Sequence, residues 1–111
     1  MKRARLTVKE RTTYHSLEDV LGCKWSVAVV AALKRGVKRP GQIERYIPGI
    51  STKVLNERLR KLAAYGLITR TDHSGTALHV EYDLTFTGEK LAGVIEQIHT
   101  LQTEHDERST P

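Results

Sequence analysis

The most regular pattern of apolar and polar positions lies in the segment STKVLNERLRKLAAYG, residues 51–66. Leu55, Leu59 and Leu62 recur at the spacing i, i+4 and i+7, which predicts an amphipathic helix whose leucine stripe faces a core. The serine that opens the segment is a good helix cap, and the glycine that closes it is a common helix terminator. The opposite face is polar, and such a face is either solvated or binds a polar partner.

Two further helices are predicted upstream of this segment. Residues 14–21 carry a short apolar stripe, and residues 24–34 are apolar on all sides at their centre, which is typical of a helix buried in a core. Residues 37–39 are expected to form a small edge strand. Residues 41–47 are expected to form a short helix that ends at a Pro-Gly pair, so that a tight turn leads into the leucine-rich helix.

After the leucine-rich helix the pattern changes from a helical period to an alternating one. Residues 67–71 are rich in β-branched side chains, residues 72–76 have the chemistry of a turn, and residues 78–84 alternate between apolar and polar, so a hairpin is predicted. Helix, tight turn, second helix and hairpin is the order of a winged helix-turn-helix, in which residues 51–66 are the recognition helix. The expected fold class is therefore α+β and mainly helical, with a two-stranded wing.

A last amphipathic helix is predicted over residues 88–104. Its apolar stripe needs a cover, because a domain of this size has little core left to bury it. Either the helix folds back on its own core or it packs against a second copy of the chain, and we favour a homodimer built from the N- and C-terminal helices. The residues predicted at that interface are Leu17, Leu91, Val94, Ile95, Ile98 and Leu101.

The predicted domain organisation follows from these elements. The 111 residues, 39% of them hydrophobic, fit one compact domain. Residues 13–104 are expected to form the winged helix-turn-helix domain, including the C-terminal dimerisation helix. Residues 1–12 are expected to be a basic arm, and residues 105–111 a polar tail.

Charge is distributed unevenly along the chain. Residues 1–71 contain 16 Lys and Arg against 5 Asp and Glu, whereas residues 72–111 contain 2 against 8, and the net charge is +5. A basic body indicates a polyanionic partner such as nucleic acid, although ordinary surface charge for solubility explains the same total.

Other classes of protein are disfavoured by what the sequence lacks. No run reaches the roughly 18 apolar residues of a membrane span, and the N-terminus has no apolar signal region. The single cysteine, Cys23, excludes an internal disulfide and suits a reducing cytoplasm. It is either a small buried residue or, beside Lys24 at a helix start, a redox-active thiol. No metal-ligand spacing and no catalytic motif is present, so no cofactor, metal or enzymatic activity is expected.

Five short motifs resemble those of one family, the HxlR-type transcriptional regulators, in the same order and at the same spacing. They span about residues 17–98. The motifs are GCKW at 22–25, IPGISTKVL at 47–55, LRKL with YGLI between 59 and 68, VEY at 80–82 and LTFTG at 84–88.

The resemblance implies a dimeric winged helix-turn-helix that controls bacterial or archaeal transcription, with the recognition helix in the major groove. The chain also departs from the family pattern. Tyr14 lies in the region where many members place a Cys-Pro pair, and Cys23 replaces a glycine, so the family's redox sensing does not carry over. His79 stands where the wing of the family has an arginine, and Phe86 replaces a frequent proline.

Together these patterns predict a sequence-specific, dimeric DNA-binding regulator that reads a palindromic operator in double-stranded DNA. The alternative is a winged-helix module that binds protein through its last helix. The sequence gives no operator, direction of regulation or small-molecule effector. The residues predicted to contact DNA are Ser51, Thr52, Lys53, Asn56, Arg60 and Lys61 on the recognition helix, with Lys38, Arg39, Arg45 and His73 beside it.

Overall fold

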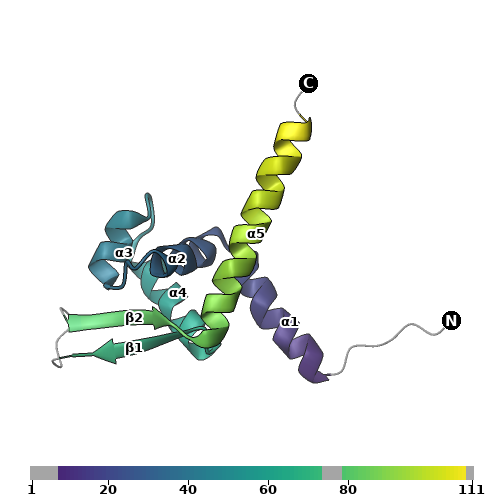
Figure 1. Cartoon of the computed structure of the whole chain (residues 1–111). Coiled ribbons are helices and arrows are strands. Elements are labelled where there is room, and N and C mark those ends of the chain that lie inside the picture. The colour runs from purple at the N-terminus through teal and green to yellow at the C-terminus, as the bar shows by residue number, and fades with distance from the viewer. Residues whose placement is uncertain (1–7, 74–78, 110–111) are drawn as a thin grey trace.

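A computed structural model of the chain describes residues 8–73 and 79–109, with the backbone alone for residues 8–14. Four helices precede a two-stranded antiparallel sheet, and a long helix follows it (Figure 1). The elements are α1 (Val8–Leu21), α2 (Lys24–Lys34), α3 (Pro40–Tyr46), α4 (Thr52–Ala64), β1 (Ile68–Asp72), β2 (Val80–Leu84) and α5 (Phe86–Ser109).

The core surrounds α2, which is apolar on all sides as its sequence predicts. Val29 and Val30 of α2 are completely buried. Leucines of α4 at helical spacing, Ile43 of α3 and the first residue of β1 pack into the same cluster. Both α3 and α4 pack against α2, which holds the helix-turn-helix in place. The side of α4 that is turned away from α2 faces solvent.

The strands β1 and β2 form the predicted hairpin, with Ile68 opposite Leu84 and Asp72 opposite Val80. The tip of this wing, residues 74–78, lies outside the described residues. The predicted edge strand at residues 37–39 is not formed as a strand. Among the described residues, one backbone hydrogen bond joins it to the sheet, from the Tyr82 N–H to the Lys38 carbonyl at 2.9 Å. The segment is too short to pair further because α3 begins at Pro40.

Helix α1 begins earlier than the sequence pattern predicts. It starts at Val8, so residues 8–12 of the expected basic arm are helical, and residues 1–7 lie outside the described residues. This stretch has no apolar periodicity, but it has no Gly or Pro either, so nothing in it ends a helix.

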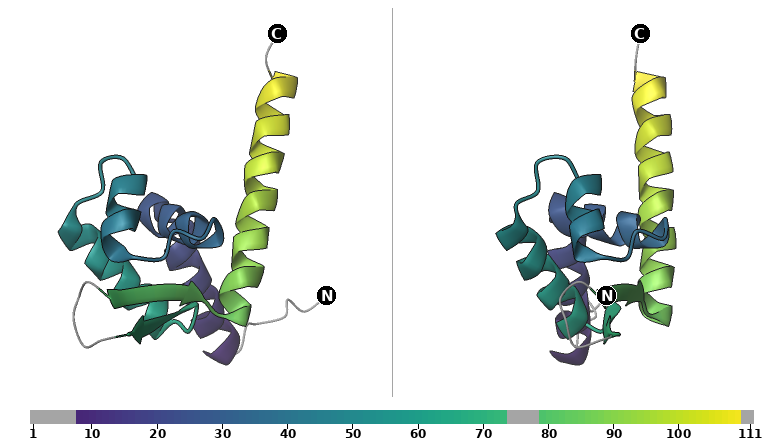
Figure 2. Two further views of the ribbon diagram at one scale, coloured as in Figure 1. Left: turned by 60° about the vertical axis from the view of Figure 1, so that its left-hand side comes forward. Right: turned by 90° about the vertical axis from the view of Figure 1, so that its left-hand side faces the viewer.

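Helix α5 is longer than predicted at both ends. It begins two residues earlier because Thr85 caps it: the Thr85 hydroxyl accepts a hydrogen bond from the Gly88 N–H at 3.1 Å. It continues to Ser109, so most of the predicted polar tail is helical, and a 2.9 Å hydrogen bond from Gln102 to Asp106 supports this stretch. The C-terminal half of α5 extends away from the rest of the fold (Figure 2).

Candidate nucleic-acid interface

Helix α4 begins as the sequence predicts, with Ser51 as its cap. The backbone of Ser51 is extended, and its hydroxyl accepts a hydrogen bond from the Val54 N–H at 3.1 Å. Past the end of the helix, Gly66 adopts a φ of +75°, a left-handed conformation that favours glycine. These two ends fix which residues form the first turn and therefore which side chains face outward.

Three exposed polar side chains lie on the outer face of α4. Lys53, Asn56 and Arg60 lie at i, i+3 and i+7, so they share one side of the helix, opposite the buried leucines. All three are exposed. Within the described part of the chain, none of them makes a hydrogen bond or an ion pair with another residue. This face is therefore positive and unpaired.

Two other residues predicted on this helix are engaged within the fold. The Lys61 ammonium lies 3.3 Å from the Asp19 carboxylate of α1, on the flank of α4. The Thr52 hydroxyl donates a hydrogen bond to the Glu44 carboxylate of α3. Lys61 is still half exposed, so the ion pair is a weak one that a phosphate can compete for.

Three of the residues predicted beside α4 are paired with acidic residues of the wing. The Lys38 ammonium lies 2.7 Å from Asp83, and the hydrogen bond to this carboxylate raises the pKa of Lys38. Arg39 and His73 both face Glu81, at 3.7 and 3.6 Å. Sequence reasoning places these three residues near the recognition helix but does not reveal the carboxylates that they face.

Arg45, the fourth residue predicted beside α4, is exposed on the last turn of α3. Unlike Lys38 and Arg39, it has no ion pair in the described part of the chain. It therefore resembles Lys53 and Arg60 in its availability to an anion.

Arg58 of α4 is a polar residue that sequence reasoning missed. Its Nη1 donates a hydrogen bond to the sulfur of Cys23 at 3.7 Å, whereas its buried Nε finds no partner among the described residues. Arg58 falls on the flank of α4 that faces the α1–α2 junction. A sequence does not show this, because the flank is defined by the packing of α1.

Cys23 precedes α2 and is partly buried. Burial acts to raise the pKa of its thiol, but hydrogen bonds from the Ser26 N–H and hydroxyl and from the Trp25 N–H, together with the charge of Arg58, outweigh it. The net pKa lies below the ordinary value. A lowered pKa favours the thiolate, the form on which a redox role for Cys23 would depend. Among residues 8–73 and 79–109, no group of three or more potential metal ligands is found.

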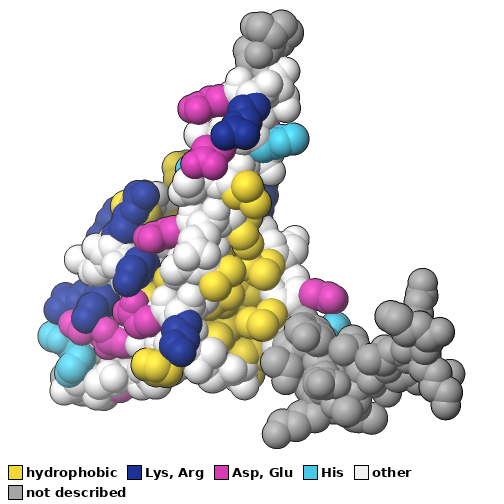
Figure 3. All heavy atoms as spheres, turned by 45° about the vertical axis from the view of Figure 1, so that its right-hand side comes forward, with side chains coloured by type: hydrophobic (Ala, Val, Ile, Leu, Met, Phe, Trp, Pro, Cys, Tyr) yellow, Lys and Arg dark blue, Asp and Glu magenta, His cyan; other side chains and the backbone are white. Residues whose placement is uncertain are grey.

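A continuous apolar face runs along α5 and the end of α1 (Figure 3). Leu101, Ile98, Val94 and Leu21 are exposed by 66%, 47%, 45% and 39%. Of the other residues predicted at a dimer interface, Leu17 and Ile95 are half-buried against the core. Leu91 is only 6% exposed, so it belongs to the protein's own core.

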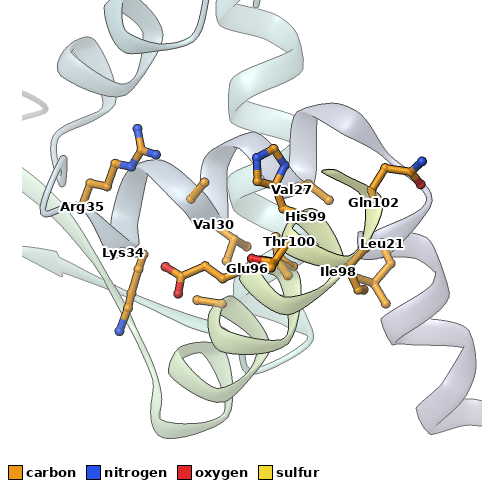
Figure 4. Close-up of a pocket in the computed structure, with 13 residues that line it drawn as sticks. Leu21, Val27, Val30, Lys34, Arg35, Glu96, Ile98, His99, Thr100 and Gln102 are labelled. Atoms are coloured by element: carbon orange, nitrogen blue, oxygen red, sulfur yellow. The ribbon is translucent and has the colours of Figure 1, made fainter. Parts of the chain in front are cut away.

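Beside this face, a groove of about 740 Å³ separates α2 from α5 (Figure 4). Val27 and Val30 of α2 and Ile95 and Ile98 of α5 lie in its apolar part. The polar part of its lining consists of Lys34, Arg35, Glu96, His99, Thr100 and Gln102. None of the described helices has the length and apolar character that crossing a bilayer requires.

The fold, with its capped α4, its hairpin and its unpaired polar face, defines a winged helix-turn-helix protein. A family model described as HxlR-like helix-turn-helix matches residues 20–110. An uncharacterised HTH-type transcriptional regulator from Synechocystis sp. is 40% identical over 83 residues, which are 75% of this chain and 62% of that relative. The chain thus spans less than two thirds of that protein's length.

Two further comparisons agree. The HTH-type transcriptional regulator YtcD from Bacillus subtilis is 32% identical over 90 residues, which are 81% of this chain and 71% of that relative. A crystal structure of a MarR-family transcriptional regulator from Enterococcus faecalis superposes with a TM-score of 0.73 at 29% identity, covering 97% of this chain and 98% of the other. The chain belongs to the HxlR-like helix-turn-helix family of DNA-binding transcriptional regulators, which are not enzymes.

Proposed function

We propose that this protein is a sequence-specific transcriptional regulator that binds a palindromic operator as a homodimer, with α4 in the major groove. The observation that carries the proposal is the outer face of α4, where Lys53, Asn56 and Arg60 are exposed and unpaired among the described residues. This positive face lies on the second helix of a helix-turn-helix, the element that such folds present to the major groove.

Each residue of this face has a role that fits its chemistry. Asn56 can donate and accept towards the edge of an adenine, the pairing that major-groove geometry favours. Ser51, Thr52 and Lys53 lie at the start of α4, where recognition helices approach bases and phosphates. Arg60, about two turns further along α4, and Arg45 on α3 would neutralise phosphates on either side of the groove.

The apolar face of α5 and α1 supports the homodimer. Exposed Val94, Ile98 and Leu101 on one helix are unusual for a monomer, because contiguous apolar surface usually marks an interface. A two-fold dimer buries the same face of both copies. It would set two copies of α4 about 34 Å apart, one turn of the duplex, which is the spacing that a palindromic site requires.

A salt titration tests this proposal directly. Binding of the protein to duplexes selected from a random-sequence library is measured by fluorescence anisotropy between about 50 and 200 mM salt. A DNA-binding α4 predicts that log K falls steeply and linearly with log salt. If the protein is instead a module that docks protein through the apolar face, selection enriches no sequence and the slope is nearly flat.

A further inference from the structure

A single carboxylate joins the first helix of the protein to its recognition helix. Oδ2 of Asp19, in α1, accepts a 2.5 Å hydrogen bond from the Tyr65 hydroxyl at the C-terminal cap of α4. The same oxygen lies 3.3 Å from the Lys61 ammonium, one turn earlier in α4. Two groups of the recognition helix are therefore held by one atom of α1.

The connection from α1 to α2 is a tight turn closed by backbone hydrogen bonds. The Gly22 N–H donates to the Glu18 carbonyl at 2.7 Å, and the Cys23 N–H donates to the Val20 carbonyl at 3.2 Å. A Cβ on Gly22 would lie 2.9 Å from the Glu18 oxygen, which is why this tight turn needs glycine. On the far side of the turn, Arg58 of α4 bonds the Cys23 sulfur. The same flank of α4 thus contacts both sides of the junction.

The opposite side of α1 faces the apolar surface. Leu17 and Leu21 lie at i and i+4 on one side of the helix, and Leu21 continues the exposed face of α5. Asp19, two residues from each, points to another side. Helix α1 therefore lies between the proposed dimer interface and α4, with an apolar contact on one side and a polar one on the other.

The Asp19–Tyr65 bond persists at neutral pH. The hydrogen bond from Tyr65 lowers the pKa of the Asp19 carboxyl, and the same bond raises the pKa of Tyr65. An ionised acceptor and a neutral donor are thus the dominant forms around pH 7, and a charge-assisted bond of this kind is short and directional.

We infer that Asp19 and Tyr65 are positioning residues that couple self-association to DNA recognition. They fix the angle of α4 relative to the dimer face, so that the two recognition helices of a dimer match one spacing of half-sites. The inference rests on the proposed function, since it concerns how a DNA-binding dimer is set. Neither residue needs to touch DNA for this role.

The test compares operators that differ only in the spacing of their half-sites. The operator is obtained by selection with the wild-type protein, and two base pairs are then inserted at its centre, which rotates one half-site by about 70°. The key variant is Tyr65→Phe, which removes one hydroxyl and changes no charge. Tyr46→Phe is the matched control. The Tyr46 hydroxyl accepts a hydrogen bond from Arg35, which follows α2, so this bond does not join α1 to α4.

Wild-type protein and Tyr46→Phe should prefer the selected spacing by at least about tenfold. Tyr65→Phe should bind a single half-site within about twofold of wild type but lose most of the preference for spacing, to about threefold or less. Asp19→Asn should do the same, and circular dichroism confirms that each variant is folded. If the hydrogen bond only stabilises the fold, its loss in Tyr65→Phe lowers folding stability and leaves the spacing preference unchanged.

The inference is overturned if folded Tyr65→Phe keeps the wild-type preference for spacing. Failure of the proposed function gives a different result: the wild-type selection enriches no sequence, or wild type itself tolerates any spacing. The two failures are distinguished by the wild-type measurement alone.

Discussion

The Lys38 ammonium lies 2.7 Å from the Asp83 carboxylate, so a cation at the entry to the helix-turn-helix is neutralised by the wing. Glu81, two residues earlier on β2, pairs with Arg39 in the same way and also lies 3.6 Å from the His73 ring. The described part of the wing therefore pairs the cations beside α4, whereas Lys53 and Arg60 on the outer face of α4 have no acidic partner among the described residues.

Replacing Asp83 with Asn should strengthen non-specific DNA binding. The change releases Lys38 and removes one negative charge near the duplex, so affinity for mixed duplex DNA at low salt should rise about two- to fivefold, and the salt slope should steepen by up to about one. Glu104→Gln, which removes the same charge far along α5, is the control and should change little. Equal effects of the two variants would show that only net charge matters.

Replacing Ile98 or Leu101 with Asp should dissociate the proposed dimer. Two-fold symmetry places each substitution in the interface twice, and a buried unpaired carboxylate is strongly unfavourable, so the dimer dissociation constant should rise at least about 100-fold. Sedimentation equilibrium measures this. Phe86→Asp is the control, because Phe86 is 77% exposed near the start of the same helix, outside the defined face. A dimer that survives both interface substitutions would place the interface elsewhere.

Gly88 and Gly93, on the same helix, should respond oppositely to alanine. A Cβ at Gly88 would lie 2.0 Å from the Leu67 carbonyl oxygen, which the backbone cannot accommodate without moving, whereas nothing lies within 4 Å of one at Gly93. Urea unfolding at fixed protein concentration should show Gly88→Ala less stable by at least about 2 kcal/mol. Gly93→Ala should gain up to about 1 kcal/mol from helix propensity. Similar values for the two would contradict the close approach of α5 to the backbone of Leu67, the residue before β1.

The Asp19–Tyr65 bond gives a pH dependence with a defined sign. The pKa of Asp19 is lower in the folded state than the roughly 3.9 of an unfolded chain, so its contribution to stability is complete above that value and is lost as pH falls through the folded pKa. Asp19→Asn should therefore be less stable than wild type at pH 7. The difference should shrink in urea unfolding near pH 3. A stability difference between wild type and Asp19→Asn that does not change with pH would mean that the charge of Asp19 does not contribute to folding stability.

The sequence predicted the parts of the fold that depend on local pattern. The leucine spacing and the Ser51 cap located α4 within a residue of its observed start, and the alternation before Leu84 located β2. The ends of the helices were predicted less accurately. The lengths of α1 and α5 depend on helix propagation through polar residues that show no apolar periodicity.

The pairing of charges was not predictable from the sequence. Lys53 and Lys61 look alike on α4, yet only Lys61 meets a carboxylate, because Asp19 comes from a helix more than 40 positions earlier. Leu91 fits the same stripe as Ile98, but α5 extends past the core, so that Leu91 is buried and Ile98 is exposed. Such differences arise from tertiary packing, which sequence spacing does not encode.

The most direct test of the proposed role of α4 is the salt dependence of operator binding by Lys53→Ala and Arg60→Ala, with Arg108→Ala at the distant end of α5 as the control for charge. Each α4 variant should weaken binding and reduce the slope of log K against log salt by about one, because each removes one phosphate contact, whereas Arg108→Ala should keep the wild-type slope. Unchanged slopes in both α4 variants would contradict the assignment of this face to DNA.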